Sequence, residues 1–340
     1  MIDIEKHEEL HEYLKKKQLI QGDKLPEYVN LTGGVSNRCV LVSSDVRALV
    51  VKQALEKLRV KEKWECKPER IHQEALGLRH LIHLTPQQNA PTFIFEDFEQ
   101  HILVMEAVPA PHDNLKTLLL KGEVQLTFAE QFGKLLGSIH ANSHDNKEYK
   151  AIFSETYYFD ALRLNPYYSF TAQQLPETTT FLNELIRSTK KTKLSLVHGD
   201  YSPKNILIHH EKLFLLDHEV IHYGDPAFDI GFSMTHLLSK MLHLYERRED
   251  FFNFCLTYWN AYRQNAAMLM LLRGFEARAV QHTLACLLAR VKGKSPLEYL
   301  DQNEQEFQLN IVLSLLRNTP ASMDNLIHNF FNAVQTKCIQ

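Results

Sequence analysis

Four polar residues in the middle of the chain have a spacing that suits phosphoryl transfer. His198, Asp200 and Asn205 follow an apolar run in the order H-x-D-x-x-x-x-N, and Asp217 ends a second apolar run twelve residues later. Carboxylate and amide oxygens placed in this way could orient an acceptor hydroxyl and hold a phosphate-bound divalent metal. Phosphoryl transfer needs little more, because its catalysis rests mostly on positioning and charge stabilisation.

The segments around these residues predict how they meet. Residues 206–208 and 213–216 are apolar and flank a polar turn, which is typical of a β-hairpin. The returning strand would bring Asp217 back beside Asn205, close to the loop that carries Asp200. An isolated match to the spacing is a weak signal, but the flanking strands and the second aspartate make it a strong one.

Strand patterns between residues 28 and 53 enclose a glycine pair. The residues of this turn that we predict to contact a nucleotide are Gly33, Gly34 and Ser36. Glycine lets backbone amides approach a phosphate, although an ordinary hairpin turn is the alternative interpretation. Lys52 favours phosphate binding, because it lies eighteen residues after Gly34 in an apolar strand, where kinases carry a phosphate-binding lysine.

Residues 68–85 have the periodicity of a helix with Ile71, Ala75, Leu78 and Ile82 on one face. Either Glu74 or Glu69 on this helix could orient Lys52 through an ion pair, and the sequence does not decide between them. Two further strands follow, and the second ends at residues that we predict to offer backbone groups to an adenine. These residues are Met105, Glu106 and Ala107.

The order of the elements predicts an α+β protein with two lobes. Residues 1–107 would form a small N-terminal lobe with an antiparallel sheet and helices, and residues 108–340 a larger, mostly helical lobe. Helices are expected over 114–120 and 128–141 and, after Gly231, over 232–244, 250–263, 266–291, 296–316 and 324–336. Residues 147–193 are not interpretable, and their aromatic segment around Arg163 could contact substrate or simply pack.

Composition narrows the classes of function. Apolar residues make up 44% of 340 residues and charged residues 23%, which is typical of a folded protein with a sizeable core. The net charge is -3 and the basic runs are short, so we expect no nucleic-acid partner. Five scattered cysteines, the lack of a secretory pattern and the lack of a membrane-length apolar run predict a soluble cytoplasmic protein without a membrane partner. A homodimer stays an open alternative.

These motifs resemble the choline/aminoglycoside phosphotransferase superfamily, small-molecule kinases with a two-lobed protein-kinase-like fold. The similarity is strongest to methylthioribose kinases. It is carried by the loop from His198 to Asn205, by the segment from Asp217 to Gly231, by residues 51–54 and by Trp64. The resemblance covers about residues 30–295 and implies ATP and Mg²⁺ as cofactors. It also implies a small hydroxyl compound as acceptor, with a sugar such as methylthioribose favoured.

The resemblance assigns roles to individual residues. It implies Asp200 as catalytic base or hydroxyl-orienting group, Asp217 and Glu219 as metal ligands, and Asp229 as a buried brace of the catalytic loop. The spacing argument adds Asn205 to the metal ligands. Trp64 and Arg290 are candidate substrate contacts. Asn205 stands where methylthioribose kinases have serine, and Ala289 where they have the first of two arginines, so the reaction class is expected to survive but the sugar is not fixed.

Two alternatives remain open at this point, and a third is excluded. An aminoglycoside or choline-type kinase is kept open by the tyrosines at positions 157, 158, 167 and 168, which could surround a cation. A catalytically inactive pseudokinase or binding module is the alternative of another class. It is disfavoured because Lys52, Asp200, Asn205 and Asp217 are all present. A metallohydrolase is not expected, since the histidines lack metal-ligand spacing.

Overall fold

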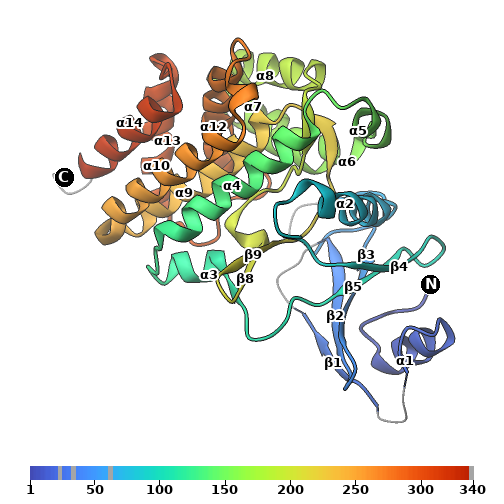
Figure 1. Cartoon of the computed structure of the whole chain (residues 1–340). Helices are drawn as coiled ribbons and strands as arrows, with labels where there is room; N and C mark the ends of the chain where they lie inside the picture. Colours follow the sequence, from blue (N-terminus) through green and yellow to red (C-terminus); the bar gives the residue numbers. More distant parts are fainter. Residues whose placement is uncertain (22–24, 32–35, 60–63, 337–340) are drawn as a thin grey trace.

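The computed structural model describes residues 1–21, 25–31, 36–59 and 64–336. A five-stranded antiparallel sheet with two helices forms the N-terminal part, and the rest of the chain is mostly helical (Figure 1). The predicted α+β fold with a small sheet lobe and a larger helical lobe is therefore confirmed. The exact boundary near Val108 stays a prediction.

The sheet is covered by one helix on each face. Its strands are β1 Glu27–Asn30, β2 Asn37–Ser43, β3 Ala48–Ala54, β4 Phe93–Asp97 and β5 Ile102–Glu106, paired in the order β1-β2-β3-β5-β4. Helix α1 (His7–Lys16) packs on the face that contains Val51, and α2 (Arg70–Leu84) on the opposite face. Since side chains alternate along a strand, Lys52 points towards α2.

Helix α2 departs from the predicted stripe in its last turns. Ile71, Ala75 and Leu78 are buried against the sheet as expected, but Ile82 is 37% exposed. Leu81 and Leu84 are buried instead, in the core of the helical lobe that includes α4 (Leu126–Ser143). The helix therefore leaves the sheet before it ends, so its final turn follows the neighbouring lobe and not the sheet.

The helical lobe is built on two pairs of helices. Helix α4 packs along α10 (Arg248–Asn265), and α9 (Ala227–His243) along α12 (Phe275–Lys292). The further helices are α3 Leu115–Leu120, α5 Lys147–Ile152, α6 Tyr157–Phe159, α7 Phe170–Gln174, α8 Thr179–Lys191, α11 Ala267–Met270, α13 Gln302–Arg317 and α14 Met323–Gln335. The short strands are β6 Asp113–Asn114, β7 Ser195–Val197, β8 Ile206–His209, β9 Lys212–Leu215 and β10 His222–Gly224.

Two predicted helix boundaries were wrong because of glycine. Helix α9 begins at Ala227 and passes through Gly231, where an added Cβ would lie 2.4 Å from the Cβ of His282 on α12. Gly231 is thus a packing residue and not the end of a loop. The single helix expected over residues 266–291 is broken at Gly274, whose φ of +77° separates α11 from α12.

The uninterpreted region between residues 147 and 193 is also helical. Between α6 and α7 it forms a π-helix, Asp160–Ser169, with Pro166 inside it. Arg163, Tyr167 and Tyr168 on this element are buried. The wider π turn does not repeat at 3.6 residues, which explains why periodicity did not identify it.

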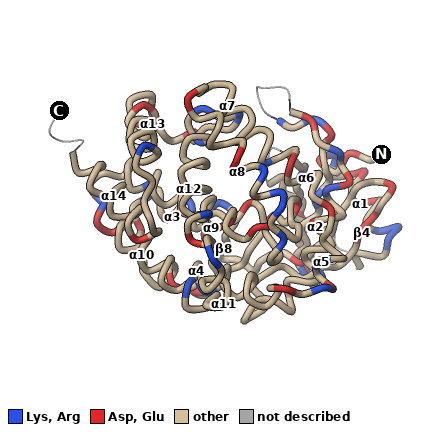
Figure 2. The backbone as a smooth tube through the Cα atoms, turned by 90° about the horizontal axis from the view of Figure 1, so that it is seen from above, with Lys and Arg blue, Asp and Glu red and all other residues tan. Residues whose placement is uncertain are grey.

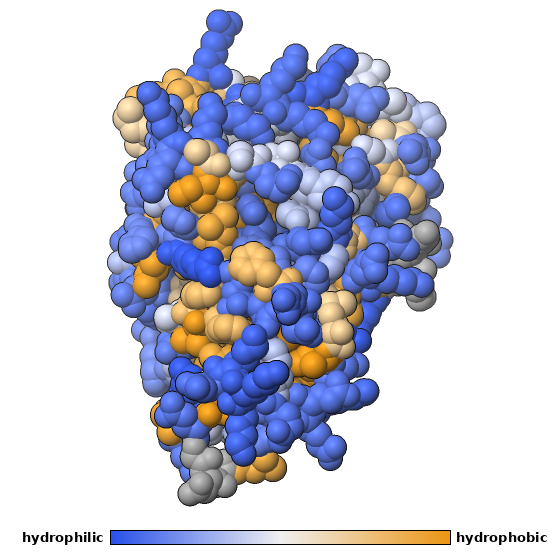
Figure 3. Space-filling model, turned by 90° about the vertical axis from the view of Figure 1, so that its right-hand side faces the viewer, coloured by the Kyte–Doolittle hydropathy of each residue, from blue (hydrophilic) through white to orange (hydrophobic). Residues whose placement is uncertain are grey.

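The surface shows charges of both signs. Lys and Arg as well as Asp and Glu are spread along the backbone (Figure 2), and apolar patches lie among hydrophilic residues on the face in Figure 3. Within the ranges that the structure describes, no helix is both long and apolar enough to cross a membrane. Cys39, Cys66, Cys255 and Cys286 are free thiols, and Cys338 lies outside the described residues.

Candidate active site

The predicted hairpin brings Asp217 back to the loop that carries Asp200. A 3₁₀ turn, Pro203–Asn205, leads into β8, and β9 returns after His210 and Glu211, both of which have positive φ (46° and 61°). Two successive positive φ values are typical of the tight turn that joins hairpin strands. The amide of Leu216 donates to the carbonyl of Asn205 at 2.9 Å, so the chain delivers Asp217 next to the catalytic loop.

Both carboxylate oxygens of Asp200 are held. The side-chain amide of Asn205 donates to Oδ2 at 2.7 Å and also to the backbone carbonyl of Asp200 at 3.0 Å. On the other side, Nη2 of Arg163 lies 2.9 Å from Oδ1, and Nε of Arg163 donates to the carbonyl of Gly199 at 2.7 Å. Arg163 comes from the π-helix, and the sequence had left its role open.

Asp229 braces the catalytic loop as predicted. Its fully buried carboxylate accepts hydrogen bonds from the amides of His198 and Gly199, both at 2.7 Å, and lies 3.1 Å from Nε2 of His140. Burial opposes ionisation, but these donors outweigh it and lower the pKa of Asp229. Gly199 is required because its φ is +78° and an added Cβ would lie 2.7 Å from Cγ2 of Val220.

Lys52 connects the sheet to the catalytic hairpin. Its Nζ lies 2.7 and 2.8 Å from the two carboxylate oxygens of Glu74, and 3.0 Å from Oδ1 of Asp217. The structure thus selects Glu74, and not Glu69, as the partner of Lys52. Burial would lower the pKa of Lys52, but the two carboxylates raise it well above its ordinary value.

The two carboxylates beside Lys52 differ in character. Burial raises the pKa of Glu74 to about 7 even though Lys52 opposes that shift. Burial also disfavours ionised Asp217, but Lys52 and Lys204 reverse this and lower its pKa. Asp217 has a φ of +67°, which is uncommon for a residue with a side chain and aims its carboxylate at the cavity. Asp217 is therefore the ionised group of this pair that faces the cavity.

Glu219 is held by a buried arginine that the sequence analysis missed. Nε of Arg70 lies 3.0 Å from Oε2 of Glu219, and the amide of Asn37 donates to the same oxygen at 3.2 Å. Arg70 is fully buried and also donates to the carbonyls of Ser36 and Leu55. Arg70 and Glu74 are one helical turn apart on α2, and two charged residues at i and i+4 within an apolar stripe would have been the signal.

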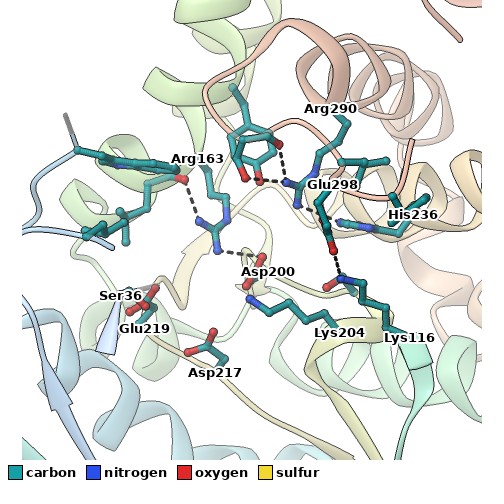
Figure 4. Close-up of a pocket in the computed structure, with 18 residues that line it drawn as sticks. Ser36, Lys116, Arg163, Asp200, Lys204, Asp217, Glu219, His236, Arg290 and Glu298 are labelled. Carbon is teal, nitrogen blue, oxygen red and sulfur yellow. Dashed lines mark hydrogen bonds and ion pairs between the residues drawn. The ribbon is translucent and has the colours of Figure 1, made fainter. Parts of the chain in front are cut away.

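Asp200, Asp217 and Glu219 line a cavity of about 380 Å³ between the two lobes (Figure 4). The predicted residues that line it are Ser36, Trp64, Asp200, Asp217, Glu219 and Arg290. Among the lining residues that were not predicted, the acidic and basic ones are Lys116, Arg163, Lys204, His236 and Glu298. Its volume is near the lower end of the range for small-molecule sites, so it suits a small ligand.

Other predicted residues lie away from this cavity. Met105 is buried at the end of β5, and the amides of Glu106 and Ala107 donate to the carbonyls of Thr92 and Ala48 within the sheet. Lys52 and Asn205 do not line the cavity, although they hold Asp217 and Asp200, which do. Gly33 and Gly34 lie outside the described residues.

The oxygen atoms of this site fit a magnesium ion that arrives with a nucleotide. Among the residues that the structure describes, no three His, Cys, Asp or Glu side chains are grouped closely enough to hold a metal by themselves. Magnesium does not need such a cage, because it is commonly bound through one or two carboxylates together with substrate phosphates. Asp217 and the amide oxygen of Asn205 supply ligands of this kind, whereas Glu219 is engaged by Arg70.

Comparisons with known proteins identify a family and similar sequences. The family described as "Phosphotransferase enzyme family" matches residues 27–263. Methylthioribose kinase of Pectobacterium carotovorum is 25% identical over 256 residues, which is 62% of this chain and 64% of that protein. The match thus spans less than two thirds of that relative's length.

Solved structures share the fold. A choline/ethanolamine kinase family protein from Mesorhizobium loti has a TM-score of 0.56 at 13% identity, over 97% of this chain and 99% of that one. An amicoumacin kinase in complex with AMP-PNP and Ca²⁺ has a TM-score of 0.51 at 14% identity, over 96% and 93%. The likeness confirms the predicted two-lobed kinase fold.

Proposed function

Because the chain belongs to the phosphotransferase enzyme family, we propose that it transfers a phosphoryl group from ATP to a hydroxyl group of a small metabolite. One observation carries the proposal: Asp200 and Asp217 line the cavity between the lobes, Asn205 bonds to Asp200, and Lys52 bonds to Asp217 from the sheet side. The methylthioribose kinase relatives favour a sugar as acceptor. A cytoplasmic location and a homodimer stay predictions.

In this proposal the nucleotide lies between the sheet and the hairpin. Lys52, oriented by Glu74, contacts the phosphates, and Ser36 lies close to them. The amides of Glu106 and Ala107 already donate within the sheet, so the adenine would be recognised by carbonyls of this segment and by the next amide, that of Val108.

The proposed magnesium ligands are Asn205 and Asp217. Glu219 is a third candidate, although its carboxylate already pairs with Arg70. When bound, the ion would neutralise phosphate charge and align the phosphates. The residues of this chain then determine the geometry of attack. Lys204 lines the same cavity and brings a further positive charge close to Asp217.

The transfer itself needs one positioned hydroxyl. The acceptor oxygen forms a bond to the γ-phosphorus, the bond from that phosphorus to the β–γ bridging oxygen breaks, and ADP leaves. The hydroxyl proton moves to the carboxylate of Asp200 late in the transfer. A carboxylate is a weak base for an alcohol, so its larger contribution is to align the nucleophile. Arg163 and Asn205 are positioning residues, because they hold the two oxygens of Asp200.

The test is an ADP-release screen against sugars, amino alcohols and aminoglycosides, with ATP binding measured separately. Asp200→Asn should remove turnover, by at least about a thousandfold, and leave ATP affinity within a few fold, because Asp200 acts on the acceptor. Asp217→Ala should lose both turnover and magnesium-dependent nucleotide binding. The exposed Asp324→Asn is the matched control and should behave as the wild type. Near-normal turnover in Asp200→Asn would refute the assignment.

A further inference from the structure

The end of the cavity away from Asp217 is rich in basic side chains. Arg290, Lys116 and His236 lie together there, and Glu298 is the single carboxylate among them (Figure 4). These side chains come from α12, α3, α9 and the loop that follows α12. The proposed transfer chemistry at Asp200 does not use any of them, so their arrangement calls for a separate explanation.

Arg290 lacks a carboxylate partner in the described part of the chain. Nη1 donates to the carbonyl and hydroxyl oxygens of Ser295 at 2.9 and 3.2 Å, and Nη2 lies 3.1 Å from Nε2 of His236. Its buried Nε has no hydrogen-bond partner, and neither has the buried hydroxyl of Tyr299 nearby. A partly buried guanidinium with only neutral partners is ready to receive an anion.

Lys240 is a second basic residue close to His236 and Tyr299. It is fully buried on α9, donates to the carbonyl of His236 at 3.2 Å, and lies 5.0 Å from the ring centre of Tyr299. No carboxylate pairs with it among the described residues. An isolated buried ammonium is costly, and burial accordingly lowers the pKa of Lys240 to about 7.

His236 also lies among an excess of positive charge. Its pKa lies well below the ordinary value, because burial and nearby cations disfavour the protonated ring. These cations are Arg290, Lys240, Lys116 and Lys204. Against them stands Glu298, which pairs with Lys116 but is 68% exposed at the rim, so solvent weakens its effect.

We propose that the acceptor of this enzyme carries an anionic group, a carboxylate or a phosphate, in addition to the hydroxyl that is phosphorylated. The inference rests on the proposed function and specifies its substrate class. The anionic group binds Arg290 and displaces Glu298 from Lys116. The hydroxyl end then lies towards Asp200, at the other end of the same cavity.

The same residues argue against a cationic acceptor. A choline-type ligand needs free aromatic faces, but the guanidinium of Arg290 lies 4.9 Å from the ring centre of Tyr167, the one lining member of the four tyrosines considered above. Tyr168 is buried and bonded to His282, and Tyr157 lies outside the cavity, with Nζ of Lys67 at 5.0 Å from its ring centre. An aminoglycoside would also need several carboxylates, whereas this end has Glu298 alone among its described lining residues.

Anion binding can be measured without knowing the acceptor. The full chain is saturated with Mg²⁺ and AMP-PNP, so that the nucleotide phosphate sites are filled, and titrated calorimetrically with inorganic phosphate and with acetate at fixed ionic strength. We expect one anion to bind, and Arg290→Gln to weaken it by about tenfold or more, the loss of a hydrogen bond to a charged group. Arg187→Gln, on the exposed face of α8, is the matched control and should bind like the wild type. Lack of anion binding to the wild type, or equal affinity in Arg290→Gln, overturns the inference.

A turnover assay is the second part of the test. ADP release is compared for matched pairs, ribose with ribose 5-phosphate and glycerol with glycerate, and for choline and kanamycin. The anionic member of a pair should have the higher kcat/KM by at least about tenfold, and Arg290→Gln should remove that preference. A preference for the neutral or cationic compounds sinks this inference and leaves the phosphotransferase proposal standing. Failure to bind Mg²⁺ and AMP-PNP would instead contradict the proposed function itself.

Discussion

Replacing Asp229 by asparagine tests whether a buried charge holds the catalytic loop in place. The carboxylate lies in the first turn of α9, is not exposed, and accepts three hydrogen bonds with both of its oxygens. Asn has nearly the same shape but one acceptor and one donor. In the variant, a side-chain NH₂ must face either the amide of Gly199 or the donors from His198 and His140.

The magnitude follows from these contacts. At least one charge-assisted hydrogen bond, worth about 1.5–3 kcal/mol, is lost, and a buried amide left without an acceptor costs about 1–3 kcal/mol more. We therefore expect Asp229→Asn to lower the free energy of unfolding by about 3–5 kcal/mol, the range for breaking a buried charged pair. Because Gly199 precedes Asp200, kcat should also fall, by about ten- to a hundredfold.

The pH dependence gives a second readout. The pKa of Asp229 is lowered in the folded protein, so its contribution is fully present above the unfolded value of about 3.9 and is lost as the pH falls through the folded pKa. The difference between wild type and variant should accordingly be constant near neutral pH and shrink below about pH 4.

Urea unfolding followed by circular dichroism measures this difference, and Asp250→Asn is the matched control. Asp250 pairs with Arg247 at 2.8 Å, but its side chain is 47% exposed, so its loss should change stability by less than about 0.5 kcal/mol. A change of less than about 1 kcal/mol in Asp229→Asn would show that the buried carboxylate does not hold the loop.

Three further predictions concern cations. Lys52→Met should weaken ATP binding by at least about tenfold in calorimetry, because it removes the ammonium that bonds from the sheet to Asp217 of the catalytic hairpin. Arg163→Lys should lower kcat by about tenfold at unchanged ATP affinity, because a single ammonium cannot hold both Asp200 and the preceding carbonyl. Lys240→Met should stabilise the protein by about 1–3 kcal/mol at pH 7 in urea unfolding. The pKa of Lys240 is about 7 in the folded protein, whereas the unfolded chain keeps this proton up to about pH 10. Between these two pH values the stability of the wild type therefore rises with pH, and the stability difference between Lys240→Met and the wild type shrinks.

The sequence predicts the catalytic hairpin well because the information is local. A polar turn between two short apolar strands fixes where the chain returns. The spacing between Asn205 and Asp217 in the sequence therefore predicts that the two residues lie close together in the structure. The same argument could have chosen Glu74 over Glu69. Glu74 lies three residues after Ile71 and four before Leu78, on the buried face of α2, whereas Glu69 precedes the helix.

The arginines that hold the site could not be placed in the same way. Arg70 and Glu219 are 149 residues apart, and Arg163 lies on a π-helix whose turns do not follow the periodicity on which helix prediction relies. Their roles depend on how the two lobes and the π-helix pack together. Likewise, Gly231 looks like a loop residue until the close approach of α12 shows why it has no side chain.

The two ends of the cavity differ in how their charges are balanced, and this difference can orient a ligand. At the transfer end each carboxylate has its own cation: Arg163 for Asp200, Lys52 for Asp217 and Arg70 for Glu219. At the other end the cations around Arg290 exceed the carboxylates. A small molecule with a hydroxyl at one end and a negative charge at the other would bind more favourably in one direction, because the reverse direction takes its charge away from Arg290 and places it beside carboxylates that already occupy the nearby cations. The charge asymmetry would thus select which hydroxyl reaches Asp200 before any contact specific to the acceptor is made.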